Sequence, residues 1–142
     1  MLAMKLLQDR TRSQHQGPTP EALSRILDDE INLAVWQRHM PLHIAEFARL
    51  LLSLNEPLAE SLCLELAAGL RDLEGYEGFI ADLKWLVSAF ACLLGARRIG
   101  LRLRVLDKAM CPRFLVDHVL FLFITSFVGV GSEWLKEGAM DR

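Results

Sequence analysis

The spacing of the apolar residues changes once along this chain, close to Gly95, and that change limits the folds open to it. Before Gly95, apolar residues recur every three or four positions, which is the spacing of amphipathic helices. After it, they alternate with polar residues or run together, which is typical of strands. Helices first and strands last predict an α+β fold. We expect an N-terminal bundle of about four helices, followed by two or three β-strands.

Cap residues indicate where the predicted helices begin and end. Thr19 is a favourable N-cap, Pro20 suits a first turn, and Glu21 is an acid that the helix dipole favours there. Gly95 is a typical helix end. The predicted helices cover about 19–37, 41–52, 55–70 and 76–95. The expected core consists of Leu27, Trp36, Phe47, Leu51, Leu66, Leu83 and Phe90.

Two segments after Gly95 have the pattern of strands. Residues 99–105 alternate apolar and polar side chains, and residues 114–128 form a longer apolar stretch. Two or three strands are too few to close a barrel or a sandwich, so we expect the sheet to be incomplete. We predict a flexible leader over residues 1–18 and a single α+β domain over 19–142 that is incomplete at its C-terminus.

Composition excludes several classes of protein. The 142 residues are 52% hydrophobic and 24% charged, which favours a folded chain, and the net charge of −2 argues against nucleic-acid binding. Apolar stretches such as 119–130 are shorter than the roughly 20 residues of a membrane-spanning helix, so we expect no membrane insertion.

The three cysteines, at positions 63, 92 and 111, have no C-x-x-C spacing and leave one thiol over. With no convincing secretory signal, this indicates a reducing cytoplasm. We expect Cys63 and Cys92 to be small core residues, because both lie in apolar helical patterns.

Four short motifs carry a resemblance to a known family. They are C-P-x-F, G-x-G-x-E-W-L, N-L-A-V-W-Q-R over residues 32–38, and D-L-x-x-L-V-x-x-F over residues 82–90. With them the chain resembles the bacterial family called domain of unknown function 1826, from about residue 25 onward. The residues that match the first two motifs and their surroundings are Cys111, Pro112, Arg113, Phe114, Asp117, Thr125, Gly129, Gly131, Glu133, Trp134 and Leu135.

The chain also departs from the family pattern. Leu115 stands where the family has the His of an H-x-D pair, and Leu120 and Leu122 replace a Pro and an Arg. Phe127 and Val130 replace a Tyr and a Pro. The family continues past position 142, with a further His-containing motif and a final strand. The resemblance therefore implies a C-terminally truncated and divergent member.

The family pattern implies a possible metal site. Its H-x-D pair, distal His and closing Arg are similar to iron(II)/2-oxoglutarate oxygenases, which would make the strands the start of a larger double-stranded β-helix-like sheet. The candidate metal ligands in this chain are Asp117 and His118. On a regular strand they face opposite sides, although a bulge could bring them together. The alternative is a hydrogen-bonded polar pair. Since other ligand positions are missing, we expect neither Fe(II) nor Zn to bind this chain.

A second group of possible ligands lies in the helical part. His39 and His43 are four residues apart, and Glu46 follows three residues later. Pro41 lies between the two histidines and is expected to interrupt the helix that they would need to share. An exposed ion-pairing face explains Glu46 equally well.

Two classes of function remain open. One is a metal-dependent, oxygenase-like protein with a degraded metal site, linked through its family to bacterial zinc homeostasis. The other is a non-catalytic helical module that binds another protein. The sequence identifies neither a substrate nor catalytic residues. The uncharged, β-prone run over residues 119–123 predicts a homodimer formed through an unpaired strand edge.

Overall fold

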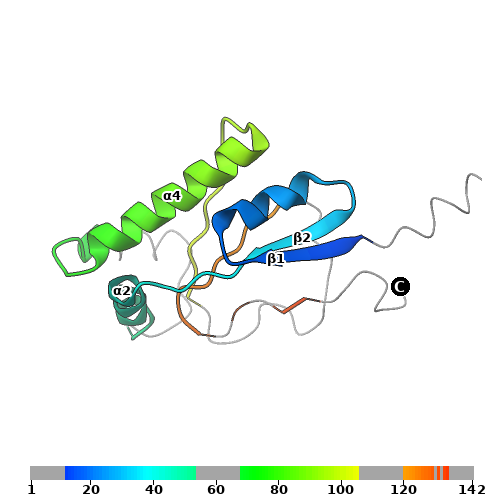
Figure 1. Cartoon of the computed structure of the whole chain (residues 1–142). Helices are drawn as coiled ribbons and strands as arrows, with labels where there is room; N and C mark the ends of the chain where they lie inside the picture. Colours follow the sequence, from blue (N-terminus) through cyan, green and yellow to red (C-terminus); the bar gives the residue numbers. More distant parts are fainter. Residues whose placement is uncertain (1–11, 54–67, 106–119, 130, 132, 135–142) are drawn as a thin grey trace, which may run out of the picture. The chain divides into compact units, whose positions relative to one another are not determined.

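A computed structural model of the chain describes residues 12–53, 68–105, 120–129, 131 and 133–134. Within them lie three helices and a two-stranded parallel sheet (Figure 1). The predicted mixture of helix and strand is therefore confirmed. A four-helix bundle and a β-helix-like sheet are not, and most of the predicted helix 55–70 lies outside the described residues. In chain order the elements are β1 (Ser13–Gly17), η1 (Pro20–Leu27), β2 (Ile31–Trp36), α2 (Leu42–Ser53) and α4 (Tyr76–Leu94).

The chain divides into two compact units. Unit 1 consists of Met1–His39 with Glu133–Arg142, and unit 2 consists of Met40–Ser132. Unit 1 thus contains β1, η1 and β2, and unit 2 contains α2 and α4. The expectation of a single domain over 19–142 stays a prediction.

The start of η1 follows the predicted signals. This 3₁₀ helix begins at Pro20, directly after an extended Thr19, and has Glu21 in its first turn. A hydrogen bond from the Thr19 side chain, and secondarily one from the backbone of Glu21, hold the pKa of Glu21 below its ordinary value. At the other end, Arg25 and Asp28 form an exposed ion pair with an N–O distance of 2.6 Å.

The predicted first helix is wrong beyond Leu27. Asp28 has an extended backbone, and Ile31–Trp36 forms strand β2 instead of more helix. Short apolar runs fit a half-buried strand and a helix equally well by spacing alone. Isoleucine, valine and tryptophan favour the strand once a partner strand is present.

That partner is β1, which lies inside the predicted leader. The two strands are parallel, with Gln14 opposite Leu33 and Gly17 opposite Trp36. A parallel pair needs a crossover connection, and η1 forms part of it. Leader residues 13–17 are thus part of the sheet, which their polar sequence, SQHQG, did not indicate.

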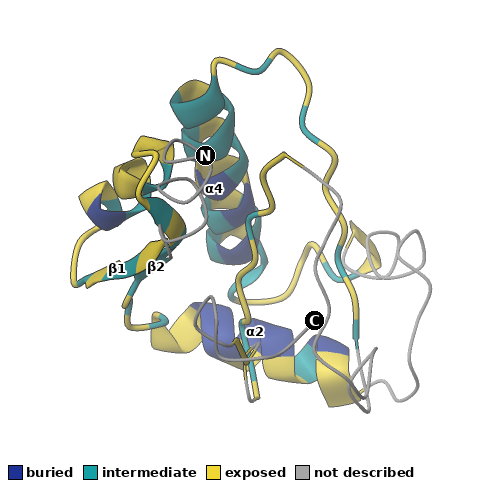
Figure 2. Cartoon of the chain, turned by 90° about the vertical axis from the view of Figure 1, so that its right-hand side faces the viewer, coloured by how far each residue is buried: buried dark blue, intermediate teal, exposed yellow. Residues whose placement is uncertain are grey.

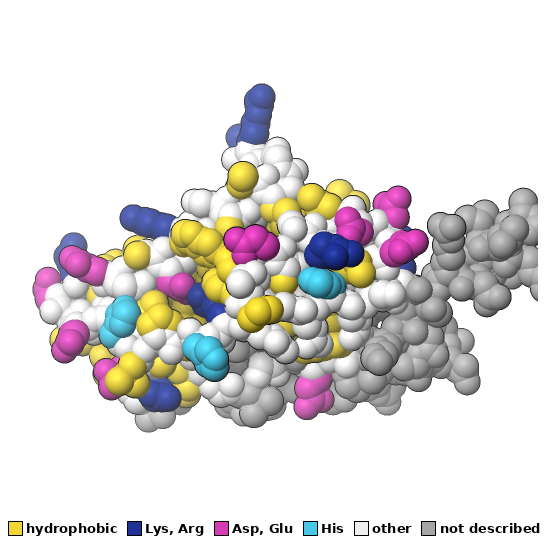
Figure 3. All heavy atoms as spheres, viewed as in Figure 1, with side chains coloured by type: hydrophobic (Ala, Val, Ile, Leu, Met, Phe, Trp, Pro, Cys, Tyr) yellow, Lys and Arg dark blue, Asp and Glu magenta, His cyan; other side chains and the backbone are white. Residues whose placement is uncertain are grey.

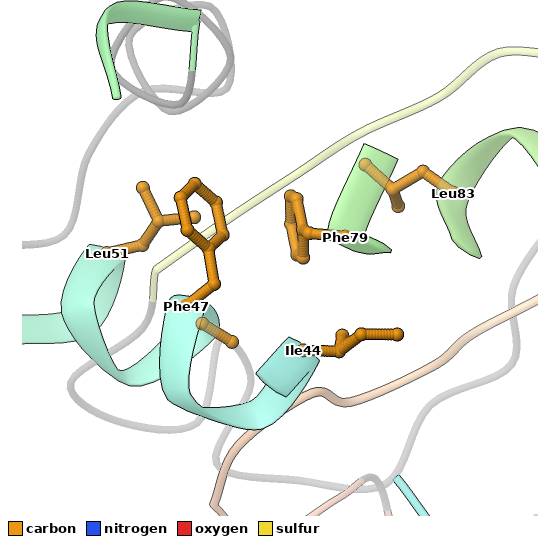
Figure 4. Close-up of a cluster of buried hydrophobic side chains, with 6 residues drawn as sticks. Ile44, Phe47, Leu51, Phe79 and Leu83 are labelled. Atoms are coloured by element: carbon orange, nitrogen blue, oxygen red, sulfur yellow. The ribbon is translucent and has the colours of Figure 1, made fainter. Parts of the chain in front are cut away.

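In unit 2, α2 and α4 form at the predicted places. Helix α2 follows Pro41, and α4 ends at Gly95, whose left-handed φ of 60° is a common helix end. Buried residues lie on both helices (Figure 2). Phe47 and Phe79 are almost fully buried, and their ring centroids are 5.1 Å apart (Figure 4). The buried cluster consists of Ile44, Phe47, Ala48, Leu51, Phe79 and Leu83.

The predicted core is therefore correct in part. Phe47, Leu51 and Leu83 belong to the buried cluster, whereas Leu27 is exposed. Phe90 is half-buried, Trp36 is half-buried within unit 1, and Leu66 lies outside the described residues.

Two glycines allow α2 and the start of α4 to approach closely. Gly75, the N-cap of α4, has a φ of 89°. A Cβ atom at Gly75 would lie 2.5 Å from the carbonyl oxygen of His43, and one at Gly78 would lie 2.5 Å from its imidazole Nε2. Neither position has room for a side chain unless α2 or the ring of His43 moves.

The two predicted strands of unit 2 are not strands where the structure describes them. Residues 99–105 and 121–126 are assigned to neither helix nor strand, and residues 114–119 lie outside the described part. Segment 99–105 alternates in part, because Arg102 and Arg104 are exposed while Leu103 packs against the core. Leu101, however, is exposed as well. The pattern thus predicted the sides of the polar residues correctly, but a strand also needs a hydrogen-bonded partner.

Candidate functional site

The predicted metal ligands cannot be placed. Asp117 and His118 both lie outside the described residues, as do Cys111 and Leu115. The metal site at this pair therefore stays a prediction.

The histidines of the helical part are described, and they do not form a joint helical site. Helix α2 begins at Leu42, so His39 precedes it and His43 lies within its first turn. This confirms that the helix does not continue through Pro41. His43 and Glu46 are both exposed. Among the described residues, no three His, Cys, Asp or Glu side chains are grouped so that they could hold a metal ion.

The segment after residue 119 has one side that packs on α4. The rings of Phe123 and Phe90 are 5.5 Å apart between centroids, and those of Phe127 and Phe79 are 4.9 Å apart. Aromatic pairs at this spacing are favourable. These two phenylalanines thus attach the segment to α4. We call Phe123 and Phe127 the inner face of the run.

The even-numbered residues at the start of the same run form an exposed apolar surface, which we call the outer face. Leu120 is 96% exposed, and Leu122 and Ile124 are each 56% exposed. Phe121, between the first two, is exposed as well, at 41%. Segments with apolar residues on both sides are usually buried on both sides, so the outer face is unusual. Apolar side chains also lie among charged ones on the surface seen in Figure 3.

A second group of family-motif residues lies in unit 1. Trp134 donates a hydrogen bond from Nε1 to Oε1 of Gln14, over 3.2 Å, and joins residues 120 positions apart. Trp36 donates from Nε1 to the carbonyl oxygen of Pro18 over 3.3 Å, and the Arg38 guanidinium lies over its ring at 5.4 Å. The sequence motifs marked both tryptophans. Nothing in the sequence indicated Gln14 as a partner.

Two further expectations have different outcomes. No helix among the described residues is both long enough and apolar enough to span a membrane.

Cys92 was expected in the core, but it is exposed on α4. Its position in an apolar pattern was misleading because α4 is apolar around much of its circumference and only part of it is covered. Cys63 lies outside the described residues.

Comparison with known proteins gives one match. The model of a family described as a protein of unknown function, DUF1826, matches residues 17–142. No curated protein and no solved structure matches the chain. The match covers most of the sequence and includes both tryptophan motifs and the exposed run. The chain therefore belongs to the DUF1826 family.

Proposed function

We propose that this chain is a non-catalytic association module that forms a homodimer through the outer face of its apolar run. The observation that carries the proposal is the group of large exposed apolar side chains at the start of the run. Phe123 and Phe127 pack on α4, whereas Leu120, Leu122 and Ile124 are exposed. An exposed group of large apolar side chains is typical of an interaction surface.

Charge favours a second copy as the partner. Residues 120–129, LFLFITSFVG, contain no charged side chain, so two copies can meet here without like-charge repulsion. The family pattern has a Pro and an Arg where this chain has Leu120 and Leu122. Those two residue types protect exposed strands from association, and both are replaced here by leucine.

The apolar surface is large enough for a weak dimer. Because Leu120 is 96% exposed and Leu122 and Ile124 are each 56% exposed, two copies can newly bury the equivalent of about four complete side chains. At about 1.5 kcal/mol or more for each, this contributes roughly 6 kcal/mol. Association costs about 4–15 kcal/mol in lost freedom of motion. We therefore expect a dimer that forms with increasing protein concentration rather than a permanent one.

Sedimentation velocity over a concentration series tests this proposal. Wild type should shift from monomer to dimer, and Leu122→Arg should stay monomeric, because each copy would bring an unpaired charge into the contact. Leu42→Arg is the matched control, since Leu42 is 67% exposed on α2 and lies outside the run. It should dimerise like wild type. A wild-type chain that stays monomeric at the highest concentration would refute the proposal.

The family pattern supports a second candidate, a metal-dependent, oxygenase-like protein with a degraded metal site. Asp117 stands at the carboxylate position of the family's H-x-D pair, and Leu115 at its histidine position. We expect little or no bound iron or zinc per chain in the isolated protein. Leu115→His should increase affinity for Fe(II) or Zn in calorimetry if Asp117 is a ligand. Tight binding by the unaltered chain would instead favour the metal-dependent class and its link to zinc homeostasis. Either function would be carried out in the reducing cytoplasm that the sequence indicates.

A further inference from the structure

No further inference is drawn: the strongest candidate, the exposed face of α4 that carries Ala81, Trp85, Ser88 and Cys92, is a surface patch of small side chains around one tryptophan, and nothing in the structure shows what covers it.

Discussion

Replacing Gly75 by alanine should destabilise unit 2 strongly, and the reason lies in two separate terms. Gly75 has a φ of 89°, and a left-handed backbone costs an L-residue about 1–2 kcal/mol. The new Cβ would also lie 2.5 Å from the carbonyl oxygen of His43 and 3.1 Å from Cβ of Phe47. Because the closer atom belongs to the backbone, α2 must move, and such overpacking costs typically about 1–3 kcal/mol. Together these terms predict a loss of about 2–5 kcal/mol.

Gly78→Ala is the matched comparison, since its Cβ would also meet His43. Here the close atom, at 2.5 Å, is Nε2 of an exposed imidazole, which can rotate away. Alanine also favours a helix by about 0.8–1.0 kcal/mol over glycine, which offsets the cost of moving the ring. We expect a net change within about 1 kcal/mol. Gly100→Ala, with nothing within 4 Å of its Cβ, is the neutral control.

Urea unfolding followed by circular dichroism measures these changes. The protein concentration is kept fixed, because the proposed self-association would make stability depend on concentration. The three variants should rank Gly75→Ala far below Gly78→Ala and Gly100→Ala. Equal stability of wild type and Gly75→Ala would refute the reasoning. A loss at Gly78 as large as that at Gly75 would mean that the imidazole of His43 is fixed rather than free to rotate.

Two further predictions concern the core and the pH dependence. Leu51→Ala should lower the free energy of unfolding in urea by about 2–5 kcal/mol, because Leu51 is buried in the core. Leu52→Ala, at the exposed neighbouring position, should cost far less. Similar losses at both positions would contradict the assignment of the core. The pKa of Glu21 is lowered chiefly by Thr19, so its stabilising effect is present above the ordinary value of 4.5 and is lost as the pH falls through the lowered one. Thr19→Val should move the carboxyl titration of Glu21, followed by NMR, back toward that value, and an unmoved titration would remove Thr19 as the cause.

The sequence predicted best where local signals agreed with one another. Pro41 and Gly95 marked the start of α2 and the end of α4 correctly, because caps and breakers act on their own backbone. Residues 31–36 were misassigned because their strand depends on β1, a polar segment whose pairing no local pattern indicates. The same limit applies to the site. The sequence marked residues 119–130 as an apolar stretch, but contacts with α4 were needed to show that Phe123 and Phe127 are the side chains that pack against it.

The hydrogen bond between Trp134 and Gln14 has a consequence for the order of folding. Unit 1 is discontinuous, since all of unit 2 is inserted between its two pieces. Closing a flexible loop of about 120 residues costs roughly 4 kcal/mol in chain entropy, more than the about 0.5–1.5 kcal/mol that one hydrogen bond contributes. This contact is therefore favoured once unit 2 has become compact and shortened the loop. During synthesis Trp134 also leaves the ribosome after all of unit 2, so Gln14 of β1 can gain this partner only after the inserted unit has been made.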